Sequence, residues 1–276
     1  MADKFMKSIT FVEGGDQYYP LPKVTNADDG KVLKVVNGAW RLDDLVRLPY
    51  LSFIGNEDFT LKTYNTTKNW DGTLEYSTDT STWNTWNGTE ISSVGSKLYL
   101  RGTGNTKITG NSNNYKFVFT GTDSLKIACE GNIENLLDYE TVSAGSHPTM
   151  AGNCYNAMFY KCTSLTSAPE LPATTLTDYC YRSMFYGCTA LTTAPALPAT
   201  TLAEGCYQRM FEGCTKIKLS TTQTGEYQTA YRIPTSGTGN VGLGALDSMF
   251  SSTGGTFKGT PSINTTYYVS TSNAVV

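Results

Sequence analysis

The sequence predicts a mainly β protein with a small α/β solenoid, built as an N-terminal β module (1–48), a β-sandwich (49–142) and a leucine-rich-repeat-like array with a C-terminal cap (143–276). Three observations predict this fold class: a 26-residue repeat, short alternating strands before it, and a composition of 39% hydrophobic but only 16% charged residues. A chain of 276 residues is long enough for two or three such modules.

The first module reads as a small β-hairpin. Asn37-Gly38 favours a tight turn between the run KVLKVV and the run that begins at Ala39. We expect three residues to fill its core or to line a symmetry axis: Val32, Val35 and Trp40. The start of the chain lacks the apolar core of a secretory signal, and no run of about 18 apolar residues predicts a membrane span. Neither export by a signal peptide nor membrane insertion is therefore expected.

The middle segment reads as a series of short strands separated by turn residues. Period-two alternation places Leu98 and Leu100 on one face of their strand, and Phe117 and Phe119 on one face of theirs. Strands at this spacing favour a sandwich or a jelly roll. The expected strands are 59–64, 74–77, 83–86, 97–101 and 115–120.

The aromatic residues of this segment have two interpretations. Aromatic side chains at alternating strand positions commonly fill a core, but rings also bind the faces of sugars. Trp86 ends its strand beside Asn87-Gly88, which makes it the leading candidate for contact with a glycan, and Trp83 and Tyr76 are its neighbours in this hypothesis.

The array contains three copies that begin at Cys154, Cys180 and Cys206. The first two, CYNAMFYKCTSLTSAPELPATTLTDY and CYRSMFYGCTALTTAPALPATTLAEG, agree at 17 of 26 positions. Repetition of this kind indicates one supersecondary unit in which each copy covers the apolar face of its neighbour.

Each copy is expected to begin with an amphipathic α-helix. At about 100° per residue its constant apolar positions fall within an arc of roughly 140°, which predicts a buried face. In the first copy these positions are Cys154, Tyr155, Met158, Phe159 and Cys162. A short strand anchored by Leu165 or Leu191 follows, and Pro169 or Pro195 ends it. The outward positions change between copies, and we expect them to make the contacts of the array surface: Arg182, Tyr186, Gln208, Arg209 and Glu212.

Two phrases resemble known families. The phrase Cys-Tyr-x-x-Met-Phe-x-Gly-Cys-Thr-x-Leu-Thr-x-Ala-Pro-x-Leu-Pro-Ala-Thr-Thr-Leu resembles the bacterial surface-antigen (BspA-type) leucine-rich repeats of adhesins and gut bacteriophage proteins. The phrase Asp29-Gly-Lys-Val-Leu-Lys-Val-Val-Asn-Gly-Ala-Trp40 resembles the attachment modules of bacteriophage head and tail fibres.

The resemblance implies a virion fibre protein, with a head fibre preferred. Its N-terminus would bind capsid or tail proteins, and its tip would contact a host-surface protein or a glycan. Such a protein would be made in the host cytoplasm, reach the outside on the virion and form a homotrimer. A bacterial surface adhesin and a polysaccharide depolymerase are the alternatives, the second disfavoured because no paired acids are expected to face one substrate.

The reactive residues indicate no enzyme and no cofactor. Cys-x7-Cys spacing on a helix spans about 12 Å, too far for a disulfide or a shared zinc ion, so the thiols are expected to be inert and buried. The single histidine, His147, precedes Pro148 at the junction that leads into the array, so neither a His-rich metal site nor a His-dependent triad is expected, and His147 is expected to be a linker or capping residue. The net charge of −3 provides no basic field for nucleic acid.

The end of the chain is expected to cap the array. Met249-Phe250 repeats Met210-Phe211 after 39 residues, which is one copy plus an insertion of 13. The insertion is expected to form a projecting loop within 221–242, followed by closing strands near 253–257 and 267–270.

Overall fold

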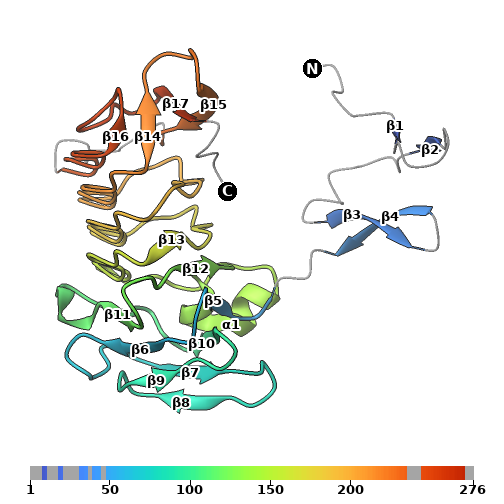
Figure 1. Ribbon diagram of the computed structural model, residues 1–276, viewed down its shortest axis with the longest axis vertical. Coiled ribbons are helices and arrows are strands. Elements are labelled where there is room, and N and C mark those ends of the chain that lie inside the picture. Colours follow the sequence, from blue (N-terminus) through green and yellow to red (C-terminus); the bar gives the residue numbers. More distant parts are fainter. Residues whose placement is uncertain are drawn as a thin grey trace. The chain divides into compact units, whose positions relative to one another are not determined.

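The computed structural model describes residues 48–234 and 244–270 in full and, before them, the backbone of four short strands. Backbone contacts divide the chain into two compact units, Met1–Arg47 and Leu48–Val276. The described part of the second unit contains three open sheets and one short α-helix, so the prediction of a mainly β protein is confirmed (Figure 1).

The first unit contains two antiparallel strand pairs. Its strands are β1 (Ser8–Thr10), β2 (Tyr18–Pro20), β3 (Lys31–Val36) and β4 (Ala39–Asp44). Val36 pairs with Ala39 and Val35 with Trp40, which is the register that the expected hairpin requires. The turn 37–38 and the side chains of Val32, Val35 and Trp40 lie outside the described residues, so their role in attachment stays a prediction.

The largest sheet of the second unit has six strands in the order β13-β12-β5-β10-β7-β8. Its strands are β5 (Leu51–Gly55), β7 (Thr73–Ser77), β8 (Asn84–Trp86), β10 (Lys97–Thr103), β12 (Ile127–Glu130) and β13 (Leu165–Ser167). All neighbours are antiparallel except β12 and β13, which run parallel. The parallel pair joins the first repeat copy to the preceding sheet.

A three-stranded sheet of order β11-β6-β9 contacts the large sheet through aromatic side chains. Its strands are β6 (Thr60–Thr63), β9 (Ile91–Ser92) and β11 (Phe117–Thr120), the last preceded by the 3₁₀ helix η2 (Asn113–Tyr115). Phe53 of β5 lies 6.3 Å from Phe117 and 5.1 Å from Phe119, and Trp86 of β8 lies 5.4 Å from Phe117, between ring centroids. These contacts place the inner faces of the two sheets against one core.

One α-helix, α1 (Asn135–Ser143), packs against β10 and was not predicted from the sequence. Two of its own residues, Leu136 and Leu137, are fully buried. The approach is so close that a Cβ on Gly102 of β10 would lie 1.8 Å from the backbone oxygen of Leu136. Gly102 is therefore required by the backbone of the helix.

The prediction that each repeat copy begins with an α-helix is wrong. These segments are series of overlapping turns. In the first copy, Met158 N–H donates to the Tyr155 carbonyl (3.1 Å), three residues back instead of four. The N–H groups between these turns point to the next copy: Tyr155 N–H donates to Cys180 O (2.8 Å) and Phe159 N–H to Met184 O (2.9 Å). We call residues 153–162, 179–188, 205–214 and 244–253 the turn segments.

Each turn segment places every fourth residue at positive φ, as the second central residue of alternate turns requires. Glycine takes this position at Gly187, Gly205, Gly213 and Gly244. Other residues take it elsewhere: Asn153, Ala157, Lys161, Tyr179, Ser183, Arg209, Ser248 and Ser252. Because a non-glycine residue rarely adopts this conformation, hydrogen bonds between copies must stabilise it.

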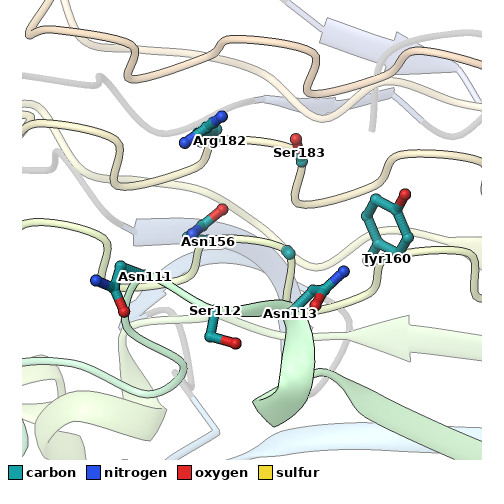
Figure 2. Close-up of a pocket in the computed structure, with 8 residues that line it drawn as sticks. Asn111, Ser112, Asn113, Asn156, Tyr160, Arg182 and Ser183 are labelled. Carbon is teal, nitrogen blue, oxygen red and sulfur yellow. The ribbon is translucent and has the colours of Figure 1, made fainter. Parts of the chain in front are cut away.

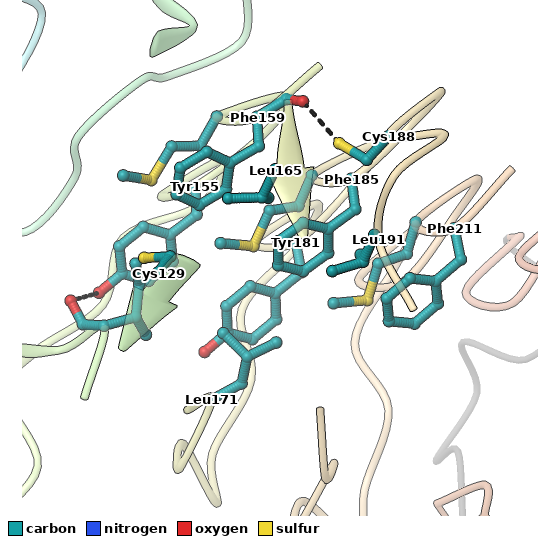
Figure 3. Close-up of a cluster of buried hydrophobic side chains, with 14 of the residues drawn as sticks. Cys129, Tyr155, Phe159, Leu165, Leu171, Tyr181, Phe185, Cys188, Leu191 and Phe211 are labelled. Carbon is teal, nitrogen blue, oxygen red and sulfur yellow. Dashed lines mark hydrogen bonds between the residues drawn. The ribbon is translucent and has the colours of Figure 1, made fainter. Parts of the chain in front are cut away.

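The constant side chains of the turn segments are stacked in columns inside the array (Figure 3). Phe159, Phe185, Phe211 and Phe250 form one column, with centroids 5.6, 5.6 and 5.4 Å apart. The tyrosines at 155, 181 and 207 form a second column, spaced 5.5 and 5.9 Å. The prediction that these constant positions are buried is confirmed, since the phenylalanines and tyrosines of both columns are at most 1% exposed.

The C-terminal sheet covers the last copy, with the order β15-β17-β14-β16. Its strands are β14 (Lys218–Ser220), β15 (Tyr227–Arg232), β16 (Gly254–Gly255) and β17 (Thr266–Ser270). The two closing strands are confirmed. The projecting loop is wrong for residues 227–232, which form β15 and pair with β17, and the rest of the insertion from 235 to 243 lies outside the described residues.

Candidate functional site

The outward side chains of the turn segments form one surface, which we call the turn face: Tyr160, Lys161, Arg182, Tyr186, Arg209 and Glu212. Tyr160 and Tyr186 occupy equivalent positions in adjacent copies and stack at 4.7 Å with an interplanar angle of 8°. The Arg209 guanidinium lies 4.9 Å from the Tyr186 centroid and pairs with Glu212 (Nε to Oε2, 2.7 Å). Three of the expected surface residues, Tyr186, Arg209 and Glu212, therefore lie together.

The other two expected surface residues lie apart from this group. Arg182 lies over the Tyr179 ring at 5.5 Å, and Gln208 is half-buried. The neighbouring variable positions Ala157 and Ser183 are buried, at 4% and 9% exposure. Arg209 takes the same place in the third copy, with the same positive φ, and is exposed, so this position faces outward only where its side chain is long enough to reach the surface.

A depression of about 260 Å³ lies at the N-terminal end of the turn face (Figure 2). Its lining combines the loop that leads into η2 with the first two turn segments. The lining residues are Asn111, Ser112, Asn113, Asn156, Ala157, Tyr160, Arg182 and Ser183. Amide and hydroxyl groups dominate this lining, and Arg182 is its one charged residue. We call it the amide pocket.

Two lysines flank the pocket at the Tyr160 ring. Lys116 Nζ lies 5.3 Å and Lys161 Nζ 5.6 Å from the Tyr160 centroid, and Lys116 also lies 5.0 Å from the ring of Tyr64. Partial burial, and secondly the charge of Lys161, lower the pKa of Lys116. Lys116 lies outside the repeat copies, so the repeat pattern gave no sign that it would reach Tyr160.

A second cluster of aromatic and charged side chains involves β7, β10 and α1. The Arg101 guanidinium lies 4.0 Å from the Trp83 centroid and 4.4 Å from that of Tyr139, and its Nε pairs with Glu75 Oε2 at 2.8 Å. Tyr50 also lies 5.9 Å from Trp83. The Trp83 ring is thus engaged by neighbours within the chain.

The structure does not bring the three expected glycan residues together. Trp86 is 1% exposed, stacks on Trp70 at 5.1 Å and donates its Nε1–H to Thr89 O at 2.7 Å, so its assignment to glycan contact is wrong. Tyr76 packs against the core, and it pairs with Leu100 on the buried face of the sheet. Trp83 contacts Arg101, whose side chain emerges on the opposite face.

The cysteines are buried packing residues. All seven are free and buried. Burial raises the pKa of Cys214 to about 12, so its thiol stays protonated at neutral pH and is a poor nucleophile and metal ligand. Cys188 and Cys214 donate their S–H groups to the carbonyls of Phe159 and Phe185 in the preceding copy, both at 3.0 Å. These thiols therefore link neighbouring copies.

His147 contacts a buried carboxyl group. Its Nδ1 lies 2.7 Å from Glu134 Oε2; the side chain of Glu134 is 2% exposed, and that of His147 is 50% exposed. Burial raises the pKa of Glu134, while the bond to His147 opposes that effect. His147 is thus the partner of a core carboxyl group, a role that its place before Pro148 does not indicate.

Within residues 48–234 and 244–270, no group of three or more histidine, cysteine, aspartate or glutamate side chains is arranged to hold a metal ion. No helix in the part of the chain that was searched is long and apolar enough to span a bilayer.

Comparison of the chain with protein-family models, with curated proteins and with solved structures finds no match. The resemblance to surface-antigen repeats and to fibre attachment modules therefore rests on the quoted residues alone. The geometry of the turn face is therefore the main basis for a function.

Proposed function

We propose that this chain is a structural, non-enzymatic fibre protein of a bacteriophage particle, carried on the head, that presents its turn face to the host surface. The observation that carries the proposal is the division of each turn segment into constant and changing positions. The constant positions are buried, as at Phe185, while the changing positions that carry long side chains, such as Arg182 and Arg209, reach the surface. A scaffold of this kind lets the outer surface vary without loss of the core.

We also propose the finer architecture: a short leucine-rich-repeat-like solenoid that follows a β-sandwich. Two features support it. Backbone hydrogen bonds connect successive copies in a repeated pattern, in which an N–H donates to the carbonyl of the residue just before its equivalent: Tyr181 N–H to Cys206 O (3.0 Å) and Phe185 N–H to Met210 O (3.0 Å). The aromatic contacts of Phe53 and Trp86 with Phe117 are those that two packed sheets make.

The separate N-terminal unit supports an attachment role. Residues Met1–Arg47 form their own compact unit with a strand pair in the expected register. We propose that this unit binds capsid or tail proteins and that the particle carries the chain as a homotrimer, made in the host cytoplasm and displayed on the virion. Sedimentation equilibrium of the full chain measures the oligomeric state, and a monomer at micromolar concentration contradicts the trimer.

Mass spectrometry of purified particles tests the function directly. A fibre protein must be present in a fixed ratio to the major capsid protein, and its absence from intact particles overturns the proposal. Addition of excess soluble chain should also slow the adsorption of particles to host cells.

Two further assays separate the proposal from its alternatives. A reducing-sugar assay on host capsular polysaccharide gives a signal only for a depolymerase. Fractionation of uninfected bacteria finds the chain in the envelope only if it is a bacterial surface adhesin.

A further inference from the structure

The amide pocket is lined mainly by amide and hydroxyl groups. Three asparagine side chains, Asn111, Asn113 and Asn156, line it together with Ser112 and Ser183. Asn156 Nδ2 donates to Gly110 O at 3.2 Å, which holds this amide in place and leaves its Oδ1 as an acceptor. One amide held in place and several amide and hydroxyl groups beside it match a ligand that carries several hydroxyl groups.

Three cations surround the pocket, and none has an acidic partner within 4 Å among the described residues. Arg182, Lys116 and Lys161 form no ion pair with any of the residues that the structure describes, whereas Arg209 on the same face pairs with Glu212 at 2.7 Å. Arg182 lines the pocket itself and the two lysines lie at the Tyr160 ring, which also lines it, in a chain whose net charge is −3. Unpaired cations beside a concave polar surface favour a ligand with negative charge.

The aromatic ring at the pocket argues against a nucleobase. Bases bind by stacking on a free aromatic face, but Tyr160 already stacks on Tyr186 at 4.7 Å and has Lys116 Nζ 5.3 Å from its centroid. Tyr160 therefore serves as a wall held in place by its neighbours and contributes a hydroxyl group.

We propose that the amide pocket binds an acidic sugar, with Arg182 on the carboxylate or sulfate group and the asparagine amides on the ring hydroxyls. The volume of about 260 Å³ is slightly below the roughly 300–1,000 Å³ of sites for drug-sized ligands, so it accommodates about one sugar ring. This inference rests on the proposed display function, because a single small site binds weakly and gains strength only when several copies act together.

Isothermal titration calorimetry and saturation-transfer NMR on the full chain test the proposal with four probes. They are a glucuronate-containing tetrasaccharide, its sulfated derivative, a neutral N-acetylglucosamine tetrasaccharide and a thymidine tetranucleotide. We expect at least one acidic sugar to bind about tenfold more tightly than the neutral one, because a charge-assisted contact is gained. The two acidic probes show which anionic group is preferred. Equal binding of the neutral sugar, tighter binding of the nucleotide, or no binding overturns the proposal.

Arg182→Gln is the principal variant, because glutamine stands at the same position of the third copy as Gln208. We expect it to weaken binding of the acidic sugar about tenfold. Asn111→Ala tests the pocket at an exposed loop residue and should weaken binding several-fold. Arg209→Gln is the matched control, because Arg209 lies on the same face outside the pocket. An equal loss of affinity in the Arg209 variant indicates a general charge effect and overturns the assignment of binding to the amide pocket.

The two levels of the proposal fail separately. A chain found on particles that binds no acidic sugar overturns the pocket and leaves the fibre function standing. A chain that binds acidic sugar but is absent from particles overturns the fibre function and leaves the sugar-binding pocket standing.

Discussion

The contact between Glu134 and His147 predicts a pH-dependent loss of stability in the variant His147→Ala. Glu134 is almost fully buried, and His147 Nδ1, at 2.7 Å, lies against its carboxyl group. The contact favours the ionised form of Glu134, because it opposes the rise in the pKa of that group that burial causes. Alanine removes that partner and leaves the carboxyl group in the core.

The expected magnitude follows from the burial of Glu134. A buried polar group that loses its hydrogen-bond partner costs about 1–3 kcal/mol, within a total stability of about 5–15 kcal/mol for a domain. The half-exposed position of His147 lets water replace part of the contact, which places the expected loss in the lower half of that range.

The sign of the pH dependence follows from the raised pKa of Glu134. The folded state binds the proton of this group more tightly than the unfolded state, so its contribution to stability is full below the ordinary glutamate pKa of 4.5 and falls as pH rises through the raised value. The bond to His147 lowers that pKa, and its loss raises the pKa further. The deficit of His147→Ala should therefore be small near pH 4 and largest near pH 8.

Urea unfolding of the full chain at these two pH values measures the deficit. In the double variant Glu134→Gln/His147→Ala the deficit should no longer depend on pH, because the titrating group is gone. Ser146→Ala is the control at an exposed neighbouring position. A deficit of equal size at both pH values, or none at pH 8, refutes the reasoning.

Three further predictions concern the core and the backbone. Phe185→Ala removes a fully buried ring stacked at 5.6 Å on each side and should lower the free energy of unfolding by about 3–5 kcal/mol in urea titration. Gly102→Ala places a Cβ 1.8 Å from Leu136 O and should cost about 3 kcal/mol or more, with exchange protection lost in α1. Lys161→Gly relieves a positive φ of 58° and should raise the melting temperature, since the relief of about 1–2 kcal/mol exceeds the added chain entropy of about 0.5–1 kcal/mol.

Each of these variants has a neighbouring control. Tyr186→Ala, at the half-exposed position next to Phe185, should cost no more than about 1.5 kcal/mol. A similar loss of stability in both variants contradicts the claim that the buried phenylalanine column stabilises the copies. Gly104→Ala meets no atom within 4 Å, so it should cost only the positive-φ penalty of about 1–2 kcal/mol. Thr163→Gly should lower stability, and a gain there equal to that of Lys161→Gly would remove the backbone explanation.

The inward positions of the repeat could be predicted, but the backbone that presents them could not. The intervals between Cys154, Tyr155, Met158, Phe159 and Cys162 alternate between one and three residues, so the pattern fits one face of a helix with a period of 3.6 and also a backbone with a period of four. The α-helix and the series of turns therefore bury the same side chains. Only the bonds to the next copy distinguish them, because alternate N–H groups leave the turn segment and need a partner there.

In the sheets, too, the burial of strand residues could be predicted from the sequence, but the packing of distant segments could not. Strand alternation was sufficient to predict that Leu98 and Leu100 are buried, and both are fully buried. The helix α1 was missed because it is short and Asp138 interrupts its helical backbone angles. Its place on β10 depends on the absence of a side chain at Gly102, a requirement that only the packed structure reveals.

The sequence alone determined the mainly β class, the 26-residue interval and which side chains of each copy are buried, because these follow from local pattern and repetition. The tertiary structure decided which side chains meet across the chain. Strand register places Trp86 in the core, and Asn111 reaches Asn156 and Arg182 only because the loop before η2 packs beside the first two copies. Contacts between distant segments depend on how the chain closes its loops, which no local periodicity specifies.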